Sequence, residues 1–454
     1  MSPKKILVLG SGSVAKPCVD YLLRDLNNHL TIACRTLVSA KVLSRNQPRT
    51  TPISLDVTSS DLDRVIADHE VVVSLVPFIY HPTVVRSAIK GKTNVVTASY
   101  VSPEIRALEN FAVEAGITIV NEVGVDPGVD HLYAVKTIGE VHEKGGKKLM
   151  TSIQIKEFYS YCGGLPALEA ANNPLRFKFS WSPRGALLSQ CNSATFLQEG
   201  REVTISSKNL MASAQPYYVM DGYSFVAYPN RNSLPFREFY NIPEAQTIIR
   251  GSLRYKGNPE LVKALFSLGW LNPEERSWLG SESTWAQLQQ RTTGAVSASE
   301  VDLISRVDEL CSFSDLEERS AVLEGLRWIG LFSEENAPVK NNLLDTLSSR
   351  LESLCSFRPG ERDLVMLQHK FVVEWQDGKI DPITSTMELL GDPEGDHAMS
   401  KSVGITCGIA TQLLLDGHPA IAKPGIVAPY TKELCDALRA KVEAENITLI
   451  EKVL

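Results

Sequence analysis

The residues at the start of this chain that are best suited to chemistry form a glycine-rich turn, Gly10-Ser11-Gly12-Ser13-Val14-Ala15. This G-x-G-x-x-A pattern follows the apolar run Lys5–Leu9 and precedes apolar residues at helical spacing. In such a turn the first glycine permits a tight bend, the second lets the backbone approach a pyrophosphate, and the amides at the helix start face the anion. The pattern therefore predicts a dinucleotide site that includes Gly10, Ser11, Gly12, Ser13 and Val14.

The end of the second predicted strand indicates which dinucleotide is bound. Leu30–Cys34 reads as a strand, and Arg35 and Thr36 follow it. NAD sites usually carry an acidic residue here for the ribose 2′-hydroxyl, whereas a guanidinium beside a hydroxyl suits a 2′-phosphate. Cys34, Arg35 and Thr36 therefore favour NADP(H). The alternative is an ordinary glycine turn with a solvated arginine, which the strand–turn–helix–strand context disfavours.

Polar residues also follow two later strands. Ser99 and Tyr100 come after the strand Asn94–Ala98, and Asp126 comes after the strand Ile117–Asn121. A phenol there can bind substrate or relay a proton, and a carboxylate can hold an ammonium or act as an acid or base. The alternatives are a packed tyrosine and a helix N-cap, because Asp-Pro-Gly also reads as a helix start. Histidine is the side chain whose charge changes most readily near neutral pH, which makes His131 a candidate, but a lone histidine at a helix start is more often structural.

Three further candidate site residues lie later in the chain. Arg231 and Arg254 are candidates for bidentate carboxylate clamps, with surface salt bridges as the alternative. Cys162, before two glycines, is a candidate for a substrate contact or a proton step, with a buried thiol as the alternative. No Ser-His-Asp pattern or Schiff-base lysine motif is present, so we expect no covalent nucleophile.

The candidate site residues have to be positioned by regular elements, and the first 121 residues are predicted to alternate between strands and helices. The predicted strands are Lys5–Leu9, Leu30–Cys34, Ile53–Val57, Val71–Leu75, Asn94–Ala98 and Ile117–Asn121. This alternation predicts a parallel, doubly wound sheet, in which ligands lie beyond the carboxyl ends of the strands.

After residue 121 the pattern changes. Strand-like runs occur at Leu149–Tyr161, Tyr217–Tyr228, Thr247–Tyr255 and Arg362–Lys379, whereas 257–354 has helical spacing and four of the six tryptophans. The helix Met399–Leu415 and the strand Ile447–Val453 restore the initial alternation. We therefore expect a substrate domain inserted into the nucleotide domain.

Composition excludes several classes of protein. The 454 residues are 43% hydrophobic and 22% charged, as in globular proteins, and the net charge of −7 with no long basic run argues against a nucleic-acid partner. Eight cysteines include no C-x-x-C pair, so we expect a reducing compartment and no metal site. No apolar run approaches a membrane span and no signal-peptide pattern is present, so we expect a cytoplasmic protein.

Longer blocks of the chain are more specific than the glycine turn. They are GSGSVAKP (10–17), ACRT (33–36), ISLDV (53–57), NEVGVDPGVDHLYAVKTI (121–138), SYCGGLPA (160–167), NPLRFKFSWSPRG (173–185), AYPNRNS (227–233), RGSLRYKG (250–257) and GERDLVMLQHKF (360–371). These blocks resemble the fungal saccharopine reductases, the NADP-dependent, L-glutamate-forming saccharopine dehydrogenases. The chain departs from the family at Arg176-Phe177, Ser182-Pro183 and 391–397, and 145–161 looks long.

The resemblance implies a fold, three domains and an activity. The fold is α/β, with an N-terminal Rossmann-like doubly wound parallel sheet completed by the C-terminus, an inserted α+β substrate and dimerisation domain, and a small helical domain. The expected domains are 1–130 plus 395–454 for NADP, 131–256 plus 357–394 for substrate, and 257–356 for the helices. The expected oxidoreductase condenses L-glutamate with L-2-aminoadipate 6-semialdehyde and reduces the imine with NADPH, giving L-saccharopine in lysine biosynthesis by the aminoadipate pathway. A homodimer is expected too.

The resemblance also implies site residues. Catalytic positions are Asp126, Tyr100 and Cys162, and substrate positions are Ser99, Tyr100, Asp126, Arg231, Ser252, Leu253 and Arg254. Cofactor positions beyond the glycine turn and residues 34–36 are Leu55, Asp56, Val76, Ala98, Ser99, Val125, Asp126 and Ser182. The alternatives are a related lysine-forming or carboxynorspermidine-type dehydrogenase, distinguished by glutamate dependence, and a non-catalytic NADP-binding sensor.

Overall fold

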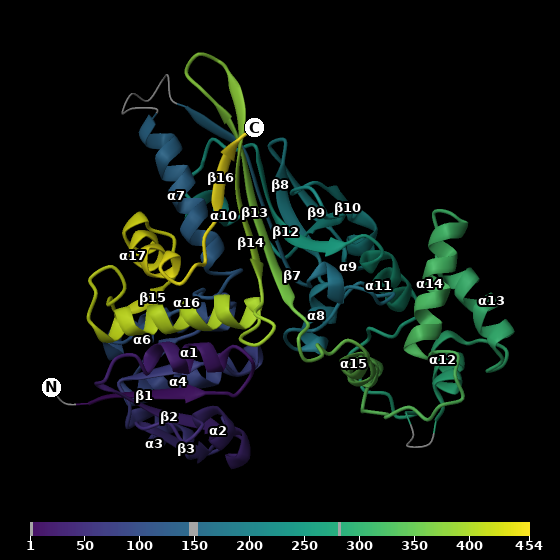
Figure 1. Cartoon of the computed structure of the whole chain (residues 1–454), viewed down its shortest axis with the longest axis horizontal. Helices are drawn as coiled ribbons and strands as arrows, with labels where there is room; N and C mark the ends of the chain where they lie inside the picture. The colour runs from purple at the N-terminus through teal and green to yellow at the C-terminus, as the bar shows by residue number, and fades with distance from the viewer. Residues whose placement is uncertain (1–2, 145–152, 280–282) are drawn as a thin grey trace. The chain divides into compact units, whose positions relative to one another are not determined.

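The computed structural model describes residues 3–144, 153–279 and 283–454 and separates into two compact units (Figure 1). Unit 1 comprises Met1–Ile155, Glu238–Ile242 and Val373–Leu454, and unit 2 comprises Lys156–Arg237 and Pro243–Val372. The chain thus begins and ends in unit 1, as expected for an inserted domain. The division into three domains stays a prediction.

Unit 1 is built on a parallel sheet, to which the described residues contribute seven strands in the order β15-β6-β5-β4-β1-β2-β3. Their bounds are β1 Lys4–Leu9, β2 Asn28–Cys34, β3 Thr50–Ser54, β4 Val71–Ser74, β5 Asn94–Val96, β6 Thr118–Val120 and β15 Gly425–Val427. The order reverses between β1 and β4, the switch point at which doubly wound sheets bind nucleotides. The predicted Rossmann-like sheet, completed from the C-terminal part of the chain, is confirmed.

Helices connect these strands and bury apolar faces against them. In unit 1 they are α1 Ala15–Leu22, α2 Leu37–Ser44, α3 Leu62–Ala67, η1 Phe78–Tyr80, α4 His81–Gly91, α5 Pro103–Arg106, α6 Glu109–Ala115, α7 Val129–Lys144, α16 Ala398–Leu415 and α17 Lys432–Glu443. In the central strands, residues 6–9 of β1 and all four residues of β4 are buried and almost all apolar, which is typical of parallel strands with both faces covered.

Helix α16 belongs to the C-terminal part of the chain but packs directly on α1, which follows the glycine turn (Figure 1). A Cβ atom added at Gly404 would lie 2.3 Å from the carbonyl oxygen of Val14, and one at Gly408 would lie 3.1 Å from the Tyr21 ring. The two glycines therefore allow the backbones to approach closely at the point where α1 begins.

Unit 2 contains a mixed sheet with strands in the order β10-β11-β12-β7-β13, and β8 pairs with both β12 and β9. The bounds are β7 Gln154–Pro166, β8 Ala194–Gln198, β9 Arg201–Ile205, β10 Gln215–Tyr217, β11 Phe225–Pro229, β12 Thr247–Tyr255 and β13 Asp363–Glu374. Strands β12 and β7 are parallel, whereas β11 and β12 are antiparallel. Within unit 1, β14 (Ile380–Leu390) pairs antiparallel with β16 (Ile450–Val453).

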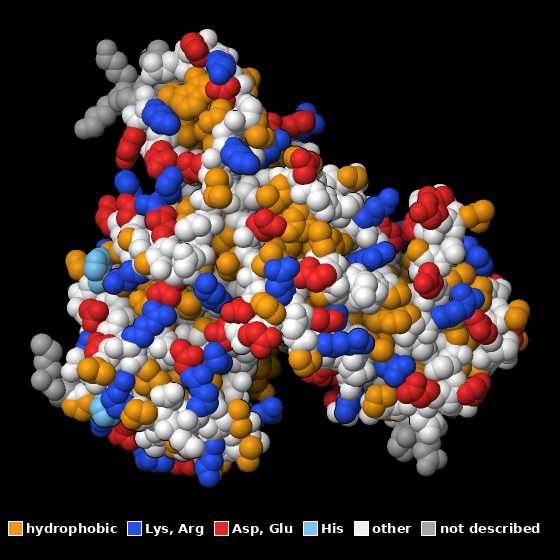
Figure 2. All heavy atoms as spheres, in the orientation of Figure 1, with side chains coloured by type: hydrophobic (Ala, Val, Ile, Leu, Met, Phe, Trp, Pro, Cys, Tyr) orange, Lys and Arg blue, Asp and Glu red, His pale blue; other side chains and the backbone are white. Residues whose placement is uncertain are grey.

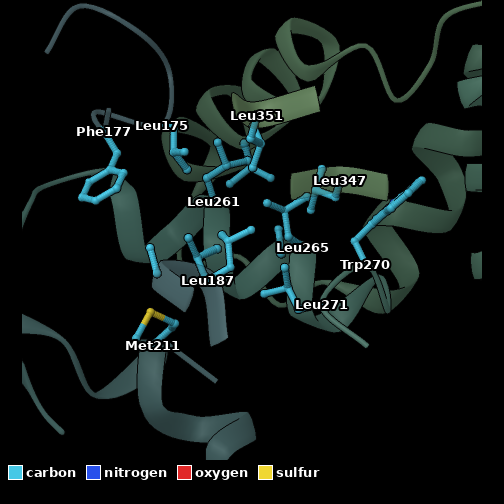
Figure 3. Packing of buried hydrophobic residues seen from close by; sticks show 14 of the residues in the cluster. Leu175, Phe177, Leu187, Met211, Leu261, Leu265, Trp270, Leu271, Leu347 and Leu351 are labelled. Carbon is cyan, nitrogen blue, oxygen red and sulfur yellow. The ribbon is translucent and has the colours of Figure 1, made fainter. Parts of the chain in front are cut away.

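The helices of unit 2 pack around a large apolar core (Figure 3). They are η2 Leu168–Ala170, α8 Pro183–Ser189, α9 Ser207–Leu210, η3 Met211–Ser213, α11 Asn258–Ser267, α12 Trp285–Thr293, α13 Glu300–Leu310, α14 Leu316–Ile329 and α15 Leu343–Leu354, and α10 Phe236–Phe239 lies at the boundary with unit 1. Leu187 of α8 points toward Leu261 and Leu265 of α11 in this core (Figure 3). Helices α11 to α15 lie within 257–354, so the prediction that this part of the chain is helical is confirmed.

Several predicted boundaries were wrong. The run Tyr217–Tyr228 is not one strand: β10 ends at Tyr217 and β11 begins only at Phe225. A turn between them contains Asp221-Gly222, with Gly222 in the left-handed region (φ 91°). The third strand begins and ends earlier than Ile53–Val57, and the last strand begins at Ile450 and pairs with β14. Strand β15, of three residues, was not predicted. The first residues of the predicted strand Leu149–Tyr161, 149–152, lie outside the described residues.

Among the described residues, no helix is long and apolar enough to cross a membrane. The face in Figure 2 carries lysine and arginine interspersed with aspartate and glutamate. This mixture accords with the modest net charge of −7.

Candidate functional site

Every cofactor position that we predicted in unit 1 lies at or just after the carboxyl end of a strand of its parallel sheet, and Cys34 is itself the last residue of β2. Residues 10–14 follow β1, 35–36 follow β2, 55–56 follow β3, Val76 follows β4, 98–99 follow β5, and 125–126 follow β6. Because parallel strands end at the same edge of a sheet, the structure brings these positions together. Backbone hydrogen bonds tie adjacent loops there, including Gly10 N to Ala33 O (3.0 Å) and Leu55 N to Cys34 O (2.9 Å).

The two glycines of the turn have different structural requirements. Gly10 has a φ of +105°, and an added Cβ would lie 2.7 Å from the carbonyl oxygen of Leu75. An added Cβ at Gly12 would meet no protein atom within 4 Å. The fold therefore requires glycine at position 10, whereas glycine at position 12 leaves space that a ligand can fill.

A cavity of about 520 Å³ opens beside this turn, lined entirely by residues of unit 1. Its lining comes from the turn, from α2 and from the start of α16, and consists of Ser11, Gly12, Ser13, Lys16, Val38, Ser39, Val42, Leu43, Arg45, Gly395, Asp396, His397 and Ser400. Serine hydroxyls and two cationic side chains make it suited to a phosphorylated ligand. The residues present thus fit a dinucleotide cofactor.

Lys16 and Asp396 form an ion pair across this cavity, with Lys16 Nζ 2.7 Å from Asp396 Oδ1. Burial works against the charge of Lys16, but the hydrogen bond and charge of Asp396 prevail and raise the pKa of Lys16. Asp396 belongs to the segment 391–397, where the sequence departs from the family that it resembles. Sequence reasoning missed both residues, because nothing in the local pattern indicates that positions 16 and 396 meet.

Arg35 is exposed at the end of β2, and among the described residues no carboxylate pairs with its guanidinium. Thr36 is the N-cap of α2: its hydroxyl accepts a hydrogen bond from Ser39 N (3.3 Å) and lies 2.7 Å from the Ser39 hydroxyl. Asp56 accepts hydrogen bonds from the Thr58 hydroxyl and amide, which lower its pKa, and the charge of Arg35 adds to this effect.

Tyr100 and Asp126, twenty-six residues apart, meet at the site. The Tyr100 hydroxyl donates a hydrogen bond of 2.7 Å to Asp126 Oδ1. At the start of α7 the Asp130 carboxylate accepts a hydrogen bond from the Gly128 amide. The structure therefore joins the predicted phenol and carboxylate into one pair.

A buried carboxylate supports the loop that carries Tyr100. Glu122, 3% exposed, accepts hydrogen bonds from Val101 N (3.0 Å) and from the Tyr430 hydroxyl (2.6 Å), and His131 Nε2 lies 2.9 Å away. Burial raises the pKa of Glu122, but these donors more than offset it, so the pKa lies below its ordinary value. His131 is buried and its other ring nitrogen lies 2.7 Å from the Tyr240 hydroxyl. These contacts agree with a structural role for His131.

The predicted substrate arginines both lie in unit 2. Arg254, 5% exposed, is on β12 opposite Val226, and its guanidinium lies over the Phe177 ring at 5.1 Å. Arg231 is exposed in the loop after β11, beyond the last register pair Pro229–Gly251, and has a φ of +50°. Arg254 therefore lies within the β11–β12 pair, whereas Arg231 lies beyond its end.

Cys162 and Ser252 are register partners on the parallel strands β7 and β12, so the structure brings these two predicted residues together. Cys162 is 8% exposed, and the Ser252 hydroxyl accepts a hydrogen bond from Asn230 Nδ2 (3.0 Å). Leu253 is fully buried. Ser182 is the N-cap of α8, where its hydroxyl accepts a hydrogen bond from Gly185 N (3.2 Å). The roles predicted for these residues toward ligands stay predictions.

Among the described residues, no group of three or more His, Cys, Asp or Glu side chains is arranged to hold a metal ion.

Two family models match the chain. The one described as saccharopine dehydrogenase NADP binding domain matches residues 6–120, and the one described as saccharopine dehydrogenase C-terminal domain matches residues 124–447.

Similar curated proteins match over their whole length. The saccharopine dehydrogenase (NADP(+), L-glutamate-forming) of Saccharomyces cerevisiae is 48% identical and covers 99% of both chains. The protein of the same name from Pyricularia oryzae is 46% identical and covers 100% of both chains.

Solved structures agree with these matches. The apo saccharopine dehydrogenase (L-Glu forming) from Saccharomyces cerevisiae has a TM-score of 0.88 and 47% identity, covering 99% of this chain and 100% of that chain. A homospermidine synthase from Legionella pneumophila, with NAD, has a TM-score of 0.59 at 10% identity, covering 99% of this chain and 91% of that one, which shows a shared fold alone.

Proposed function

Because the chain belongs to the saccharopine dehydrogenase family, we propose that it is an NADP-dependent, L-glutamate-forming saccharopine dehydrogenase. In the biosynthetic direction it joins the amine of L-glutamate to the aldehyde of L-2-aminoadipate 6-semialdehyde and reduces the resulting imine to L-saccharopine. In the reverse direction it oxidises L-saccharopine. The reaction would serve lysine biosynthesis by the aminoadipate pathway.

The observation that carries this proposal is the identity of 46–48% over essentially the whole chain with L-glutamate-forming enzymes. Both the cofactor half and the substrate half are included in these matches. A sensor protein that kept only the cofactor loop would not need the Tyr100–Asp126 pair or Arg254. The alternatives of a sensor or a neighbouring dehydrogenase are therefore not favoured.

NADP(H) supplies the hydride in this reaction. Among residues of the chain, Arg35 and the serines of the cavity would hold the phosphates. Asp126, whose carboxylate accepts the Tyr100 hydrogen bond, would hold the substrate ammonium or take its proton. Because the substrate amine is itself the nucleophile, no side chain has to attack; the protein has to orient the reactants and exclude water.

The product carries three carboxylates, and Arg231 and Arg254 are suited to bind two of them. Arg254 lies within the β11–β12 pair and Arg231 lies beyond its end, so we assign the two arginines to different carboxylates. A guanidinium held over an aromatic ring, as Arg254 is over Phe177, keeps its planar fork oriented. Ser252 and Cys162 lie on adjacent strands and would border the same ligand.

The test is a set of NADPH oxidation assays with the purified full chain. NADPH absorbance should fall when the semialdehyde and L-glutamate are both present and should be stable when either is omitted. L-lysine in place of L-glutamate should give no oxidation. Turnover that did not depend on glutamate would contradict the proposed function and would favour a neighbouring dehydrogenase.

We propose further that the protein acts in the cytoplasm as a homodimer. The modest net charge and the lack of a membrane-spanning helix among the described residues support the first proposal. The exposed strand β16 at the edge of its sheet, with Ile450 and Val453 each 65% exposed, supports the second. Light scattering of the purified chain should give twice the monomer mass; a monomer at micromolar concentration would contradict the dimer.

A further inference from the structure

A second set of buried polar side chains lies behind the site, at the ends of β4 and β5. His81, the first residue of α4, is 2% exposed, and Ser74 and Thr97 are each 1% exposed. His81 Nδ1 lies 2.9 Å from the Ser74 hydroxyl, and His81 Nε2 lies 2.9 Å from the Ser99 hydroxyl and 3.4 Å from the Thr97 hydroxyl. His81 thus joins the last residue of β4 to the loop that carries Ser99 and Tyr100.

This arrangement fixes the Ser99 hydroxyl from the side of the protein. Burial lowers the pKa of His81 to about 4, so the imidazole is neutral near pH 7 and presents one donor and one acceptor nitrogen. The edge of the ring packs against Phe78, with ring centroids 6.2 Å apart. A ring held at both nitrogens cannot turn without losing hydrogen bonds, which in a buried setting are costly to lose.

Hydrogen bonds also hold the backbone of Ser99 in place. Its carbonyl oxygen accepts hydrogen bonds from Glu122 N (3.1 Å) and Asn121 Nδ2 (3.3 Å), and its amide donates to the Thr97 hydroxyl (3.3 Å). Ser99 itself is half-buried and follows β5 at the carboxyl edge of the sheet. A hydroxyl can donate one hydrogen bond and accept two, so the contact with His81 leaves Ser99 capacity for a further partner.

We infer that His81 is a positioning residue: it fixes the orientation of the Ser99 hydroxyl, and through it the reactants bound beside Tyr100 and Asp126. This inference rests on the proposed function, because it assumes that Ser99 contacts a reactant. It assigns to the reaction a residue that acts through Ser99 and that sequence reasoning did not identify.

Two matched variants test the inference. The amide of His81→Gln reaches the position of Nε2 and can keep the contact with Ser99, whereas the shorter amide of His81→Asn reaches only the position of Nδ1, next to Ser74. We expect kcat/KM for saccharopine to fall about 10-fold or more in His81→Asn and about 3-fold or less in His81→Gln. Equal losses in the two variants would overturn the inference.

A double-mutant cycle with Ser99→Ala separates positioning from a general effect on stability. If His81 acts through Ser99, His81→Asn in the Ser99→Ala background should cause no further loss of kcat/KM, although the thermal midpoint should still fall. Losses that multiply would overturn the inference. If His81→Asn does not fold, the inference is tested with Ser99→Ala. Wild-type kcat/KM in that variant would contradict the inference, because His81 is proposed to act through the Ser99 hydroxyl.

An inactive wild-type chain in these assays would contradict the proposed function. An active wild-type chain with multiplying losses would contradict only the role of His81. The two failures are therefore distinguishable in one set of measurements.

Discussion

At the scale of single residues, the site depends on a few positions whose surroundings differ sharply. Gly10 and Gly12 belong to one motif, yet only Gly10 is confined by neighbouring backbone. Tyr100 and Asp126 share a hydrogen bond, and Arg35 is exposed where a phosphate can reach it. Single substitutions can therefore separate cofactor binding, chemistry and stability.

Gly12→Ala should leave the free energy of unfolding unchanged within about 0.5 kcal/mol, because the new methyl group meets no protein atom. It should raise the Kd for NADPH about 10-fold or more, because the methyl group fills the space that the pyrophosphate needs. Fluorescence titration with NADPH and urea denaturation measure the two quantities.

Gly10→Ala is the matched control and should lose about 1–3 kcal/mol of stability, because of its φ of +105°. An unchanged Kd in Gly12→Ala would place the pyrophosphate elsewhere.

Arg35→Ala should weaken NADPH binding about 10-fold to 100-fold and change NADH binding little, since only NADPH carries the 2′-phosphate. Titration of the wild type and the variant with each coenzyme measures the ratio of their Kd values for NADPH and for NADH. Arg45→Ala offers a comparison, because Arg45 also lines the cavity but pairs with Asp20. Equal weakening of both coenzymes by Arg35→Ala would remove the argument for a phosphate contact.

Tyr100→Phe and Asp126→Ala should each lower kcat by about 100-fold or less, the range expected for a positioned acid or base in a reaction that needs no protein nucleophile. The two losses should not multiply in the double variant, because the residues share one hydrogen bond. Steady-state assays with saccharopine measure both effects. A loss of many orders of magnitude in Tyr100→Phe, with binding intact, would identify Tyr100 as an essential acid.

At the scale of elements, helix α16 packs closely against α1 and the turn before it. The contact depends on Gly404, where a Cβ would lie 2.3 Å from the Val14 carbonyl oxygen. Two elements almost 400 residues apart in sequence thus build one side of the cofactor cavity.

Gly404→Ala should therefore cost about 1–3 kcal/mol of stability and also weaken NADPH binding, because α1 must move away from α16. Gly139→Ala is the control: Gly139 lies within α7, an added Cβ meets nothing within 4 Å, and the change should stabilise the protein by about 0.5–1 kcal/mol. Thermal melting and NADPH titration of both variants provide the comparison. Normal NADPH affinity in a destabilised Gly404→Ala would show that α16 does not position the turn.

At the scale of the whole molecule, segments far apart in the chain converge on Glu122. His131 of α7 and Tyr430, in the C-terminal part of the chain, contact its carboxylate, and Tyr240 contacts His131. The folded-state pKa of Glu122 lies below its ordinary value of 4.5, so its contribution to stability is present above that pH and is lost as the pH falls below it.

Glu122→Gln should lower the free energy of unfolding by about 1–3 kcal/mol at pH 7, because a neutral amide cannot satisfy all the donors. The difference from the wild type should shrink as the pH falls below about 4.5. Urea denaturation from pH 7 to pH 3 measures it, and Glu324→Gln, on an exposed position of α14, should show no such dependence. A difference that stays constant with pH would contradict this account.

The local sequence determined a large part of this protein. Apolar runs broken by Gly10, Arg35 or Tyr100 predicted the parallel strands and the loops at their carboxyl ends, because a βα repeat is encoded by short-range periodicity. The boundaries were less accurate where an apolar run is interrupted by a turn, as between β10 and β11, and the strand β15 was not predicted.

Only the tertiary structure decided which distant residues meet. It joined Tyr100 to Asp126, placed Asp396 on Lys16, closed α16 on α1, and put the neutral ring of His81 behind Ser99. These contacts link residues from 18 to almost 400 positions apart. Their physical basis is the packing of buried faces and the need of every buried polar group for a partner, which no local pattern records.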